Sequence, residues 1–471
     1  MIASLTPQSP AAAAARPTVR VVDNEALLPT SSFKHGNGTL WQCDTNNKFL
    51  MLMCRDIIAR RVATSNQYQR NWRWGVIFSL GELLLYQTIT TYSVLPRNML
   101  TVERHEHTVV EMPDRGVSCF HAYYPIRVEP STPLLLLFPS LTANQTFYSF
   151  MLQYVLARYG WIVVVMNRRG LCERLTTPVF HIMGNDEDVV QMMLRLEQNP
   201  RLCKRRIVGM GLSMGGNVLT RYVGRYAPLS PTSSPHLAHR ICAGVTICSP
   251  LNLSDIHVQT PLIEDVLVGN IKQVYLDPYA GLFANYSPYT ERVYGQLKQC
   301  RSLIELAFLH IKLCCPVCVA NQECDQHKIV VVADVAEADT KAKASAFQAM
   351  LTDPNGALPN EWDYTSPSMW RSYAMFDAAR HTRTVEIPFM AITTGDDPIV
   401  RHSISTKRQL MCSRHVVRVH AGGGSHCILR DDVTQTNSCL SWGEQLALCF
   451  LHDNLELYSQ QSKEQKQKLA R

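Results

Sequence analysis

The sequence predicts an α/β fold: a mostly parallel central sheet with helices on both faces and a large cap insertion. Two observations predict it. Over roughly residues 115–250, short and wholly apolar runs alternate with segments whose apolar residues recur at helical spacing. The alternation breaks between about residues 251 and 384 and then resumes, which indicates an insertion within one sheet.

The predicted strands are short apolar runs, and helical segments separate most of them. The strands expected before the insertion are Leu134–Phe138, Trp161–Met166, Ile207–Met210 and Ala243–Ser249. The helices expected among them are Phe147–Tyr159, Asp186–Glu197 and Gly215–Tyr226. After the insertion we expect strands Phe389–Thr394 and Val416–Val419 and a closing helix Trp442–His452. Strands that alternate with helices in this way are typical of parallel sheets.

The length of 471 residues exceeds what one compact core usually needs, so extensions and insertions are expected. The predicted organisation is a disordered segment 1–30, an N-terminal extension 31–100, a first part of the core 101–250, a cap or lid insertion 251–384 with a cysteine cluster, a second part of the core 385–456, and a polar tail 457–471. A helical patch, Ala336–Met350, is expected within the insertion.

Charge and composition exclude some function classes. The net charge of +7 is mild for this length, and no Lys/Arg block is interleaved with aromatic residues, so nucleic acid is not an expected partner. A mild positive charge suits an anionic membrane surface. Residues 1–20 lack the apolar core of a secretory signal, so the sixteen cysteines are expected to be mostly free thiols in a reducing compartment.

No run of about 20 apolar residues is present, so a standard transmembrane helix is not predicted. The nearest segment, Val76–Ile89, is short and contains Glu82. It is interpreted either as a buried helix or as one that rests in the membrane interface. The expected location is therefore the cytoplasmic side, with association to a membrane surface; the sequence does not indicate an oligomeric state.

One pentapeptide points to nucleophilic catalysis. Gly211 to Gly215 read Gly-Leu-Ser-Met-Gly and match G-x-S-x-G. An apolar strand ends at Met210 and a helix opens at Gly215, which is the strand–turn–helix setting of a nucleophile elbow in an α/β-hydrolase. We therefore predict Ser213 as the nucleophile and the N–H of Met214 as an oxyanion-hole donor. The alternative is an ordinary glycine-rich turn.

An acid and then a histidine should follow the serine in chain order. Asp396 and Asp397 follow one predicted strand, and Asp397 is preferred because it precedes the apolar pair Ile399-Val400. The alternative is that both carboxylates only shape the turn. His426 follows three glycines at the end of the next strand, in a loop free to place its imidazole beside Ser213. The predicted triad is Ser213, Asp397 and His426.

The oxyanion hole needs a second N–H from the loop after an earlier strand. Pro139-Ser140-Leu141-Thr142 follows Leu134–Phe138, and Leu141 is the predicted donor. Many hydrolases of this kind carry glycine at the position of Ser140.

Taken together, several motifs resemble the YheT-like family of α/β-hydrolases. The motifs are Asn167-Arg-Arg-Gly170, Thr177-Pro178, Gly184-x-x-Glu-Asp-Val189, Gly211-Leu-Ser-Met-Gly-Gly-Asn217, Asp396-Asp-Pro398 and the glycines before His426. Pro113-Asp-Arg-Gly116 resembles an early turn of that family, with Arg115 in place of a glycine. The resemblance spans roughly residues 95–450 and departs from the family at Ser140 and at Leu171-Cys-Glu173.

This resemblance implies ester hydrolysis of lipid-like substrates, with Ser213 as nucleophile, Asp397 as acid and His426 as base. The expected enzyme is a serine hydrolase of lipase or esterase type that acts on acylglycerols or phospholipids and needs no cofactor. Two alternatives stay open from the sequence. One is a catalytically weak or inactive hydrolase-fold protein that binds a lipid or a protein partner. The other is an acyltransferase that uses the same serine.

The insertion also contains candidate metal ligands. Cys315-Pro-Val-Cys318 and Cys324-Asp-Gln-His327 supply four ligands suited to a structural zinc ion. The loop between the two pairs is shorter than in familiar zinc ribbons. The alternative is a run of free thiols, and the predicted catalytic set needs no metal.

Overall fold

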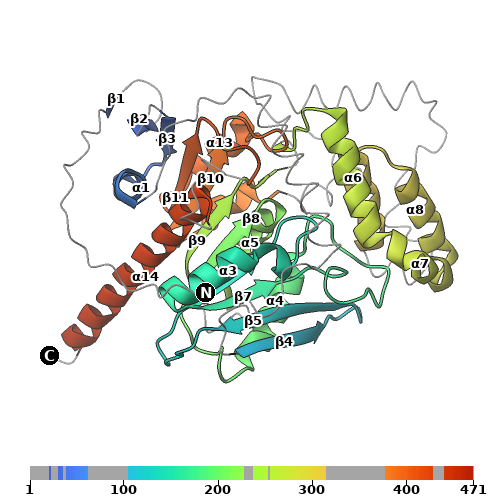
Figure 1. Cartoon of the computed structure of the whole chain (residues 1–471), viewed down its shortest axis with the longest axis horizontal. Coiled ribbons are helices and arrows are strands. Elements are labelled where there is room, and N and C mark those ends of the chain that lie inside the picture. Colours follow the sequence, from blue (N-terminus) through green and yellow to red (C-terminus); the bar gives the residue numbers. More distant parts are fainter. Residues whose placement is uncertain are drawn as a thin grey trace, which may run out of the picture.

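The computed structural model describes residues 21–22, 30–35, 39–61, 104–226, 237–252, 255–314, 377–427 and 440–469. Its strands are β1 (Val21–Val22), β2 (Thr30–His35), β3 (Thr39–Asp44), β4 (Arg104–Glu111), β5 (Val117–Tyr124), β6 (Leu134–Phe138), β7 (Ile162–Met166), β8 (Ile207–Leu212), β9 (Ile241–Ile247), β10 (Phe389–Thr394) and β11 (Val416–Ala421). They form one sheet in the order β1-β2-β3-β11-β10-β9-β8-β6-β7-β5-β4 (Figure 1).

The centre of this sheet is parallel and both edges are antiparallel. β11, β10, β9, β8, β6 and β7 run parallel, with Leu134 of β6 opposite Ile162 of β7 and Ile207 of β8. β6, β7 and β8 are wholly buried, which explains why they read as unbroken apolar runs. The predicted α/β class and its six strands are confirmed, with strand ends shifted by at most two residues.

Helices cover both faces of the sheet. They are α1 (Lys48–Arg61), η2 (Gln145–Tyr148), α3 (Ser149–Tyr154), η3 (Val155–Tyr159), α4 (Asp186–Glu197), α5 (Met214–Tyr226), η4 (Leu237–Arg240), η8 (Ala379–Thr384), α13 (Ile404–Met411) and α14 (Trp442–Leu469). Because successive strand residues face opposite sides, Leu135 packs into a core with α1, α3 and α14, whereas Leu136 packs into a second core with α4 and α5.

The described part of the insertion is a helical cap. It consists of α6 (Pro261–Tyr275), η6 (Asp277–Tyr279), α7 (Ala280–Tyr286), α8 (Pro288–Gln299) and α9 (Leu303–Cys314), which lie together beside the sheet (Figure 1). The Thr260 hydroxyl caps α6 and Ser287 forms a capping box on α8. The cap has its own apolar core, which also takes in Met214, Ile399 and Val400 from the sheet's loops.

The N-terminal region differs from the sequence expectation. β2 and β3 form a hairpin, and β3 pairs with β11 so that Trp41 lies opposite Ala421. Two residues of the segment expected to be disordered, Val21–Val22, pair with β2. Trp41 also packs edge-on against Trp442 at 4.8 Å. The extension therefore continues the sheet, because β11 would otherwise expose an unpaired edge.

The C-terminal end also differs. The closing helix was expected to end at His452 and a frayed tail to begin at residue 457, but α14 continues to Leu469 (Figure 1). The residues beyond His452 are largely Glu, Gln, Lys and Leu, which have high helix propensity. Among the helices that the structure describes, none has the length and apolar character required to cross a bilayer.

Several sequence expectations fall outside the described residues. They concern Val76–Ile89, Ala336–Met350 and the zinc candidates Cys315, Cys318, Cys324 and His327. They stay predictions. Within the described cap, the apolar stretch that opens α9 packs into the cap core through Leu303 and Leu306.

Candidate active site

Ser213 stands on a sharp turn between β8 and α5. Its φ is +49°, a left-handed conformation that is uncommon for a residue with a side chain. The Ser213 N–H donates to the carbonyl of Ile247 at 2.8 Å, and its own carbonyl accepts from Gly216 N–H at 3.0 Å. These two bonds hold the strained residue between neighbouring strand ends, so the hydroxyl projects from the carboxyl end of the sheet.

Glycines around Ser213 allow backbone to approach backbone. A Cβ atom on Gly215 would lie 2.0 Å from the carbonyl oxygen of Phe138, and one on Gly211 would lie 2.4 Å from the Cα of Gly216. Neither obstacle is a flexible side chain, so a larger residue would have to displace the main chain. The first turn of α5 is consequently pressed against the loop that follows β6.

His426 bridges the serine and an aspartate. Its Nε2 lies 3.0 Å from Ser213 Oγ, and its Nδ1 lies 2.9 Å from Asp397 Oδ2 and 3.1 Å from Oδ1. Asp397 Oδ1 also accepts from the N–H groups of Ile399 and Val400, each at 2.8 Å. The Asp397 side chain is only 2% exposed and that of His426 13%, so the carboxylate acts on the imidazole with little screening by water.

The neighbouring acid, Asp396, holds the histidine loop. Its Oδ1 accepts from the N–H of Ser425 at 2.7 Å, while the carbonyl of Ser425 accepts from the Thr394 hydroxyl at 2.8 Å. Both sides of the residue before His426 are therefore fixed by the end of β10. Burial raises the pKa of Asp396. The structure thus brings Asp397, and not Asp396, to the imidazole.

The loop that contains Leu141 is held by one guanidinium. Arg168, which follows β7, donates to the carbonyls of Pro139 at 2.8 Å, Ser140 at 2.6 Å and Leu141 at 2.9 Å. In a trans peptide the N–H points opposite to the preceding carbonyl. Because the Ser140 carbonyl points to Arg168, the Leu141 N–H points away from that guanidinium. Burial lowers the pKa of Arg168.

Two tyrosines complete the support of this loop. The Tyr148 hydroxyl accepts from Ser140 N–H at 2.9 Å and donates to Ser140 Oγ at 3.1 Å, and the Tyr275 hydroxyl donates to the Leu141 carbonyl at 3.1 Å. The serine that replaces the usual glycine thus has a partner of its own. The sequence analysis did not assign Arg168, Tyr148 or Tyr275 to the site; the available signal was a charged residue two positions after a wholly apolar strand.

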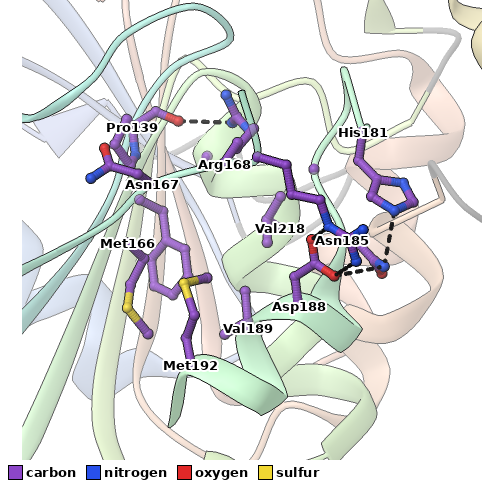
Figure 2. A pocket seen from close by; sticks show the side chains of 14 residues that line it. Pro139, Met166, Asn167, Arg168, His181, Asn185, Asp188, Val189, Met192 and Val218 are labelled. Carbon is purple, nitrogen blue, oxygen red and sulfur yellow. Dashed lines mark hydrogen bonds and ion pairs between the residues drawn. The ribbon is translucent and has the colours of Figure 1, made fainter. Parts of the chain in front are cut away.

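Arg169, the residue next to Arg168, anchors the segment after β7 to two carboxylates. It binds Asp188 of α4 through two bonds of 2.7 Å and Asp114 of the β4–β5 turn at 2.5 Å. Figure 2 shows Arg168 directed toward Pro139, with Asp188 and His181 on the far side of the same cavity. That cavity is about 20 Å³, which is room for a single water molecule and too small for an acyl chain.

Sheet order and turn geometry together define the fold. From β4 to β11 the strands lie in the order β4-β5-β7-β6-β8-β9-β10-β11, only β5 runs opposite to the others, and the sharp serine turn follows β8. The chain has the α/β-hydrolase fold. Serine, aspartate and histidine follow β8, β10 and β11 in the chain order that this fold uses.

Comparisons with known proteins give partial matches, and no family model matches the chain. The chain is 31% identical over 126 residues to Embryogenesis-associated protein EMB8 from Picea glauca, which is 26% of this chain and 25% of that protein. It is 23% identical over 150 residues to Abhydrolase domain-containing protein 2 from Drosophila melanogaster, which is 31% of this chain and 35% of that protein. The chain therefore spans about a quarter to a third of the length of these relatives.

Solved structures are similar at low sequence identity. The DcsB complex with its substrate analogue is 11% identical, with a TM-score of 0.42 over 75% of this chain and 100% of that one. A putative aryl esterase from Burkholderia cenocepacia is 13% identical, with a TM-score of 0.36 over 78% of this chain and 100% of that one.

The contact at Gly215 makes a stability prediction. Gly215→Ala should lower the free energy of unfolding by about 1–3 kcal/mol or more, because the new methyl group meets the Phe138 carbonyl. Gly269→Ala is the matched control: Gly269 is exposed in α6 and a Cβ there meets nothing within 4 Å. It should raise stability by about 0.5–1 kcal/mol through helix propensity. Urea denaturation measures both; equal stabilities of the two variants would contradict the contact.

Proposed function

We propose that this chain is a serine hydrolase that cleaves carboxylic esters through an acyl-serine intermediate. The observation that carries the proposal is the continuous hydrogen-bonded path from Asp397 through His426 to Ser213, with distances of 2.9 and 3.0 Å. A nucleophile, a base and an orienting acid in this order are the parts that acyl transfer requires.

In the proposed reaction His426 Nε2 accepts the Ser213 proton while Oγ attacks the ester carbonyl carbon. The tetrahedral intermediate collapses, and the protonated imidazole donates that proton to the departing alkoxide. A water molecule then attacks the acyl-serine while His426 accepts one of its protons. The second tetrahedral intermediate collapses, the imidazolium returns that proton to Ser213 Oγ, and the carboxylic acid is released. Asp397 holds the imidazole tautomer and stabilises the imidazolium.

The oxyanion is assigned to two backbone donors. Met214 N–H lies at the start of α5, where the helix dipole favours negative charge. Leu141 N–H points away from Arg168, from a loop pinned at three consecutive carbonyls. Donors fixed in advance stabilise the developing charge without reorganising, and one such donor is typically worth a factor of about 10²–10³ in kcat.

The proposed substrates are esters with an apolar acyl group, such as acylglycerols or phospholipids. The support is the cap, whose apolar core adjoins the sheet's catalytic loops through Met214, Ile399 and the partly buried Leu141. The motifs given above and the partial match to the fly abhydrolase-domain protein support the proposal that the chain is a YheT-like hydrolase. Apolar walls beside the nucleophile favour substrates that bury methylene groups.

The first test of the proposal is covalent labelling by a fluorophosphonate probe. Ser213→Ala should abolish both labelling and ester hydrolysis, since the probe reacts with the activated hydroxyl. His426→Ala should reduce hydrolysis as strongly, because triad members act as a unit. Labelled protein is read by gel fluorescence, with circular dichroism as the check of folding. Robust labelling of a folded Ser213→Ala protein would remove the assignment.

The two aspartates should differ sharply in a substitution test. Asp397→Asn is expected to lower kcat by about 10⁴, because an amide at this position favours the wrong imidazole tautomer. Asp396→Asn is the matched control, since the amide keeps an oxygen that can accept the Ser425 N–H. The decrease in kcat caused by Asp396→Asn should be far smaller. Steady-state kinetics on one soluble ester compares them, and the reverse ranking would move the acid to Asp396.

Acyl-chain preference tests the substrate class. With p-nitrophenyl esters of increasing length, kcat/KM should rise beyond the short chains, because each buried methylene adds about 0.8 kcal/mol, or up to about fourfold. Measurements below the critical micelle concentration keep the substrate monomeric. A maximum at acetyl or butyryl esters would contradict the lipid-like substrate while leaving ester hydrolysis itself intact.

A further inference from the structure

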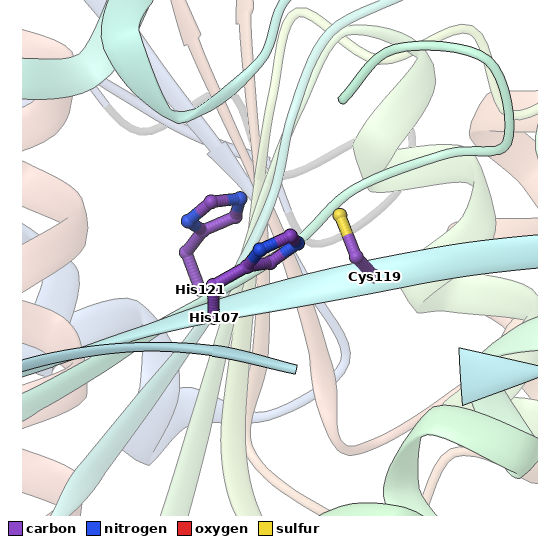
Figure 3. A group of neighbouring side chains, drawn as sticks. All are labelled: His107, Cys119 and His121. Carbon is purple, nitrogen blue, oxygen red and sulfur yellow. The ribbon is translucent and has the colours of Figure 1, made fainter. Parts of the chain in front are cut away.

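A cluster of metal-ligating side chains lies on the edge hairpin of the sheet. β4 and β5 pair antiparallel, with His107 opposite His121 and Val109 opposite Cys119. Residues two apart on a strand face the same side, so Cys119 and His121 share a face and His107 joins them from the neighbouring strand. Figure 3 shows the two imidazoles and the thiol gathered on one side of β5.

We propose that His107, Cys119 and His121 bind a transition-metal ion, with zinc as the expected occupant. One nitrogen from each imidazole and the Cys119 sulfur all lie within 4.8 Å of one another. Ligands of a tetrahedral zinc ion, at about 2.0–2.3 Å from the metal, lie roughly 3.3–3.8 Å apart. A small rotation of the side chains, above all of the exposed His107, would bring the ligand atoms to the separations that a tetrahedral zinc ion requires.

His121 supplies the most specific observation. Its residue exposure is 7%, and among the described residues its Nε2 is buried with no hydrogen-bond partner. Its Nδ1 lies 2.9 Å from His105 Nε2. When His121 Nδ1 donates this bond to His105 Nε2, His121 Nε2 carries the lone pair, which is the tautomer that a metal ion at Nε2 requires. A buried polar atom without a partner is costly, and a metal ion would satisfy it.

His121 binds a metal ion in its neutral imidazole form, in which one ring nitrogen carries a lone pair. Without metal, the hydrogen bond with Cys172 and burial raise the pKa of Cys119, so that residue is a thiol. Metal binding would then form the S–metal bond and release the thiol proton to water.

The residues around the cluster suit a metal ion that binds nitrogen and sulfur ligands. Glu173 Oε1 lies 2.9 Å from His107 Nε2, a carboxylate–histidine contact of the kind that orients metal ligands and leaves Nδ1 for the metal. Asn167 Nδ2 donates to Cys119 Sγ at 3.8 Å. Two imidazoles and a thiolate select zinc over calcium or magnesium, which prefer oxygen ligands.

We assign Cys172 as the fourth ligand, a position that its side chain reaches by moving toward the group of His107, Cys119 and His121. Cys172 interacts electrostatically with Cys119, and its thiol donates to Gln145 Oε1 at 2.9 Å. It belongs to the loop after β7, four residues beyond Arg168. A metal bound by all four residues would therefore link the edge hairpin to the segment that holds the oxyanion loop. This proposal is independent of the proposed ester hydrolysis.

The test uses full-length protein carrying Cys315→Ser and Cys318→Ser, so that the second candidate cluster cannot contribute. Reduced, metal-free protein is titrated with Co²⁺, and zinc affinity is measured by competition with a chromogenic chelator. About one ion per chain is expected, with thiolate-to-cobalt charge-transfer absorption and the intense d–d bands of four-coordinate cobalt. Zinc should also raise the melting temperature.

Single substitutions distinguish this site from adventitious binding. Cys119→Ser should abolish the charge-transfer band, and His121→Gln should lower zinc affinity by at least about 10–100-fold. His107→Gln should give a similar loss with little disturbance of the core, because that side chain is 38% exposed. Cys203→Ser combined with His452→Gln, away from the hairpin, should change nothing. Absence of stoichiometric metal, unchanged affinity in His107→Gln, or a Cys119–Cys172 disulfide formed in place of metal binding would each overturn the proposal.

Discussion

The contact between Gly215 and the Phe138 carbonyl is the constraint on which the candidate site depends. A Cβ at Gly215 would come within 2.0 Å of that oxygen, so the start of α5 and the loop after β6 can meet only through glycine. This approach brings the first turn of α5 against the loop that follows β6, and Ser213, between β8 and α5, has a φ of +49°. The positions of the nucleophile and of the oxyanion donors therefore both depend on one close approach of the backbone.

Two adjacent arginines keep that arrangement from relaxing. Arg168 binds three loop carbonyls, whereas Arg169 binds the carboxylates of Asp188 and Asp114. Irregular backbone beside a buried sheet has polar groups that need hydrogen-bond partners, and the guanidinium of Arg168 supplies donors for three of them. Arg169 is buried as well, and removing one partner from a buried ion pair typically costs about 3–5 kcal/mol. The short segment after β7 therefore has little freedom to move.

The sequence could predict whatever depends on local patterning. Buried parallel strands appear in the sequence as apolar runs, and the nucleophile elbow has a fixed residue spacing. The sheet and the role of Ser213 could therefore be predicted from the sequence. Pairing between distant segments could not be predicted, because nothing in the sequence near Trp41 indicates that this residue lies opposite Ala421. The His107–Cys119–His121 cluster was missed for the same reason, because its members converge only once the register of β4 and β5 is known. The polar end of α14 could not be assigned from its composition, because Glu, Gln and Lys are common both in helices and in disordered tails.

The two antiparallel additions have a common physical effect. β3 covers β11 at one side of the parallel strands, and β5 covers β7 at the other, so neither parallel edge is left with unpaired backbone groups. Each hairpin is also anchored by side chains: Trp41 packs on Trp442 of α14, and Asp114 of the β4–β5 turn binds Arg169. The strands that carry Ser213, Asp397 and His426 are therefore supported from both flanks. A triad spread over the ends of three separate strands keeps its hydrogen-bond distances only if those strands hold their relative register, and pairing on both sides provides that rigidity.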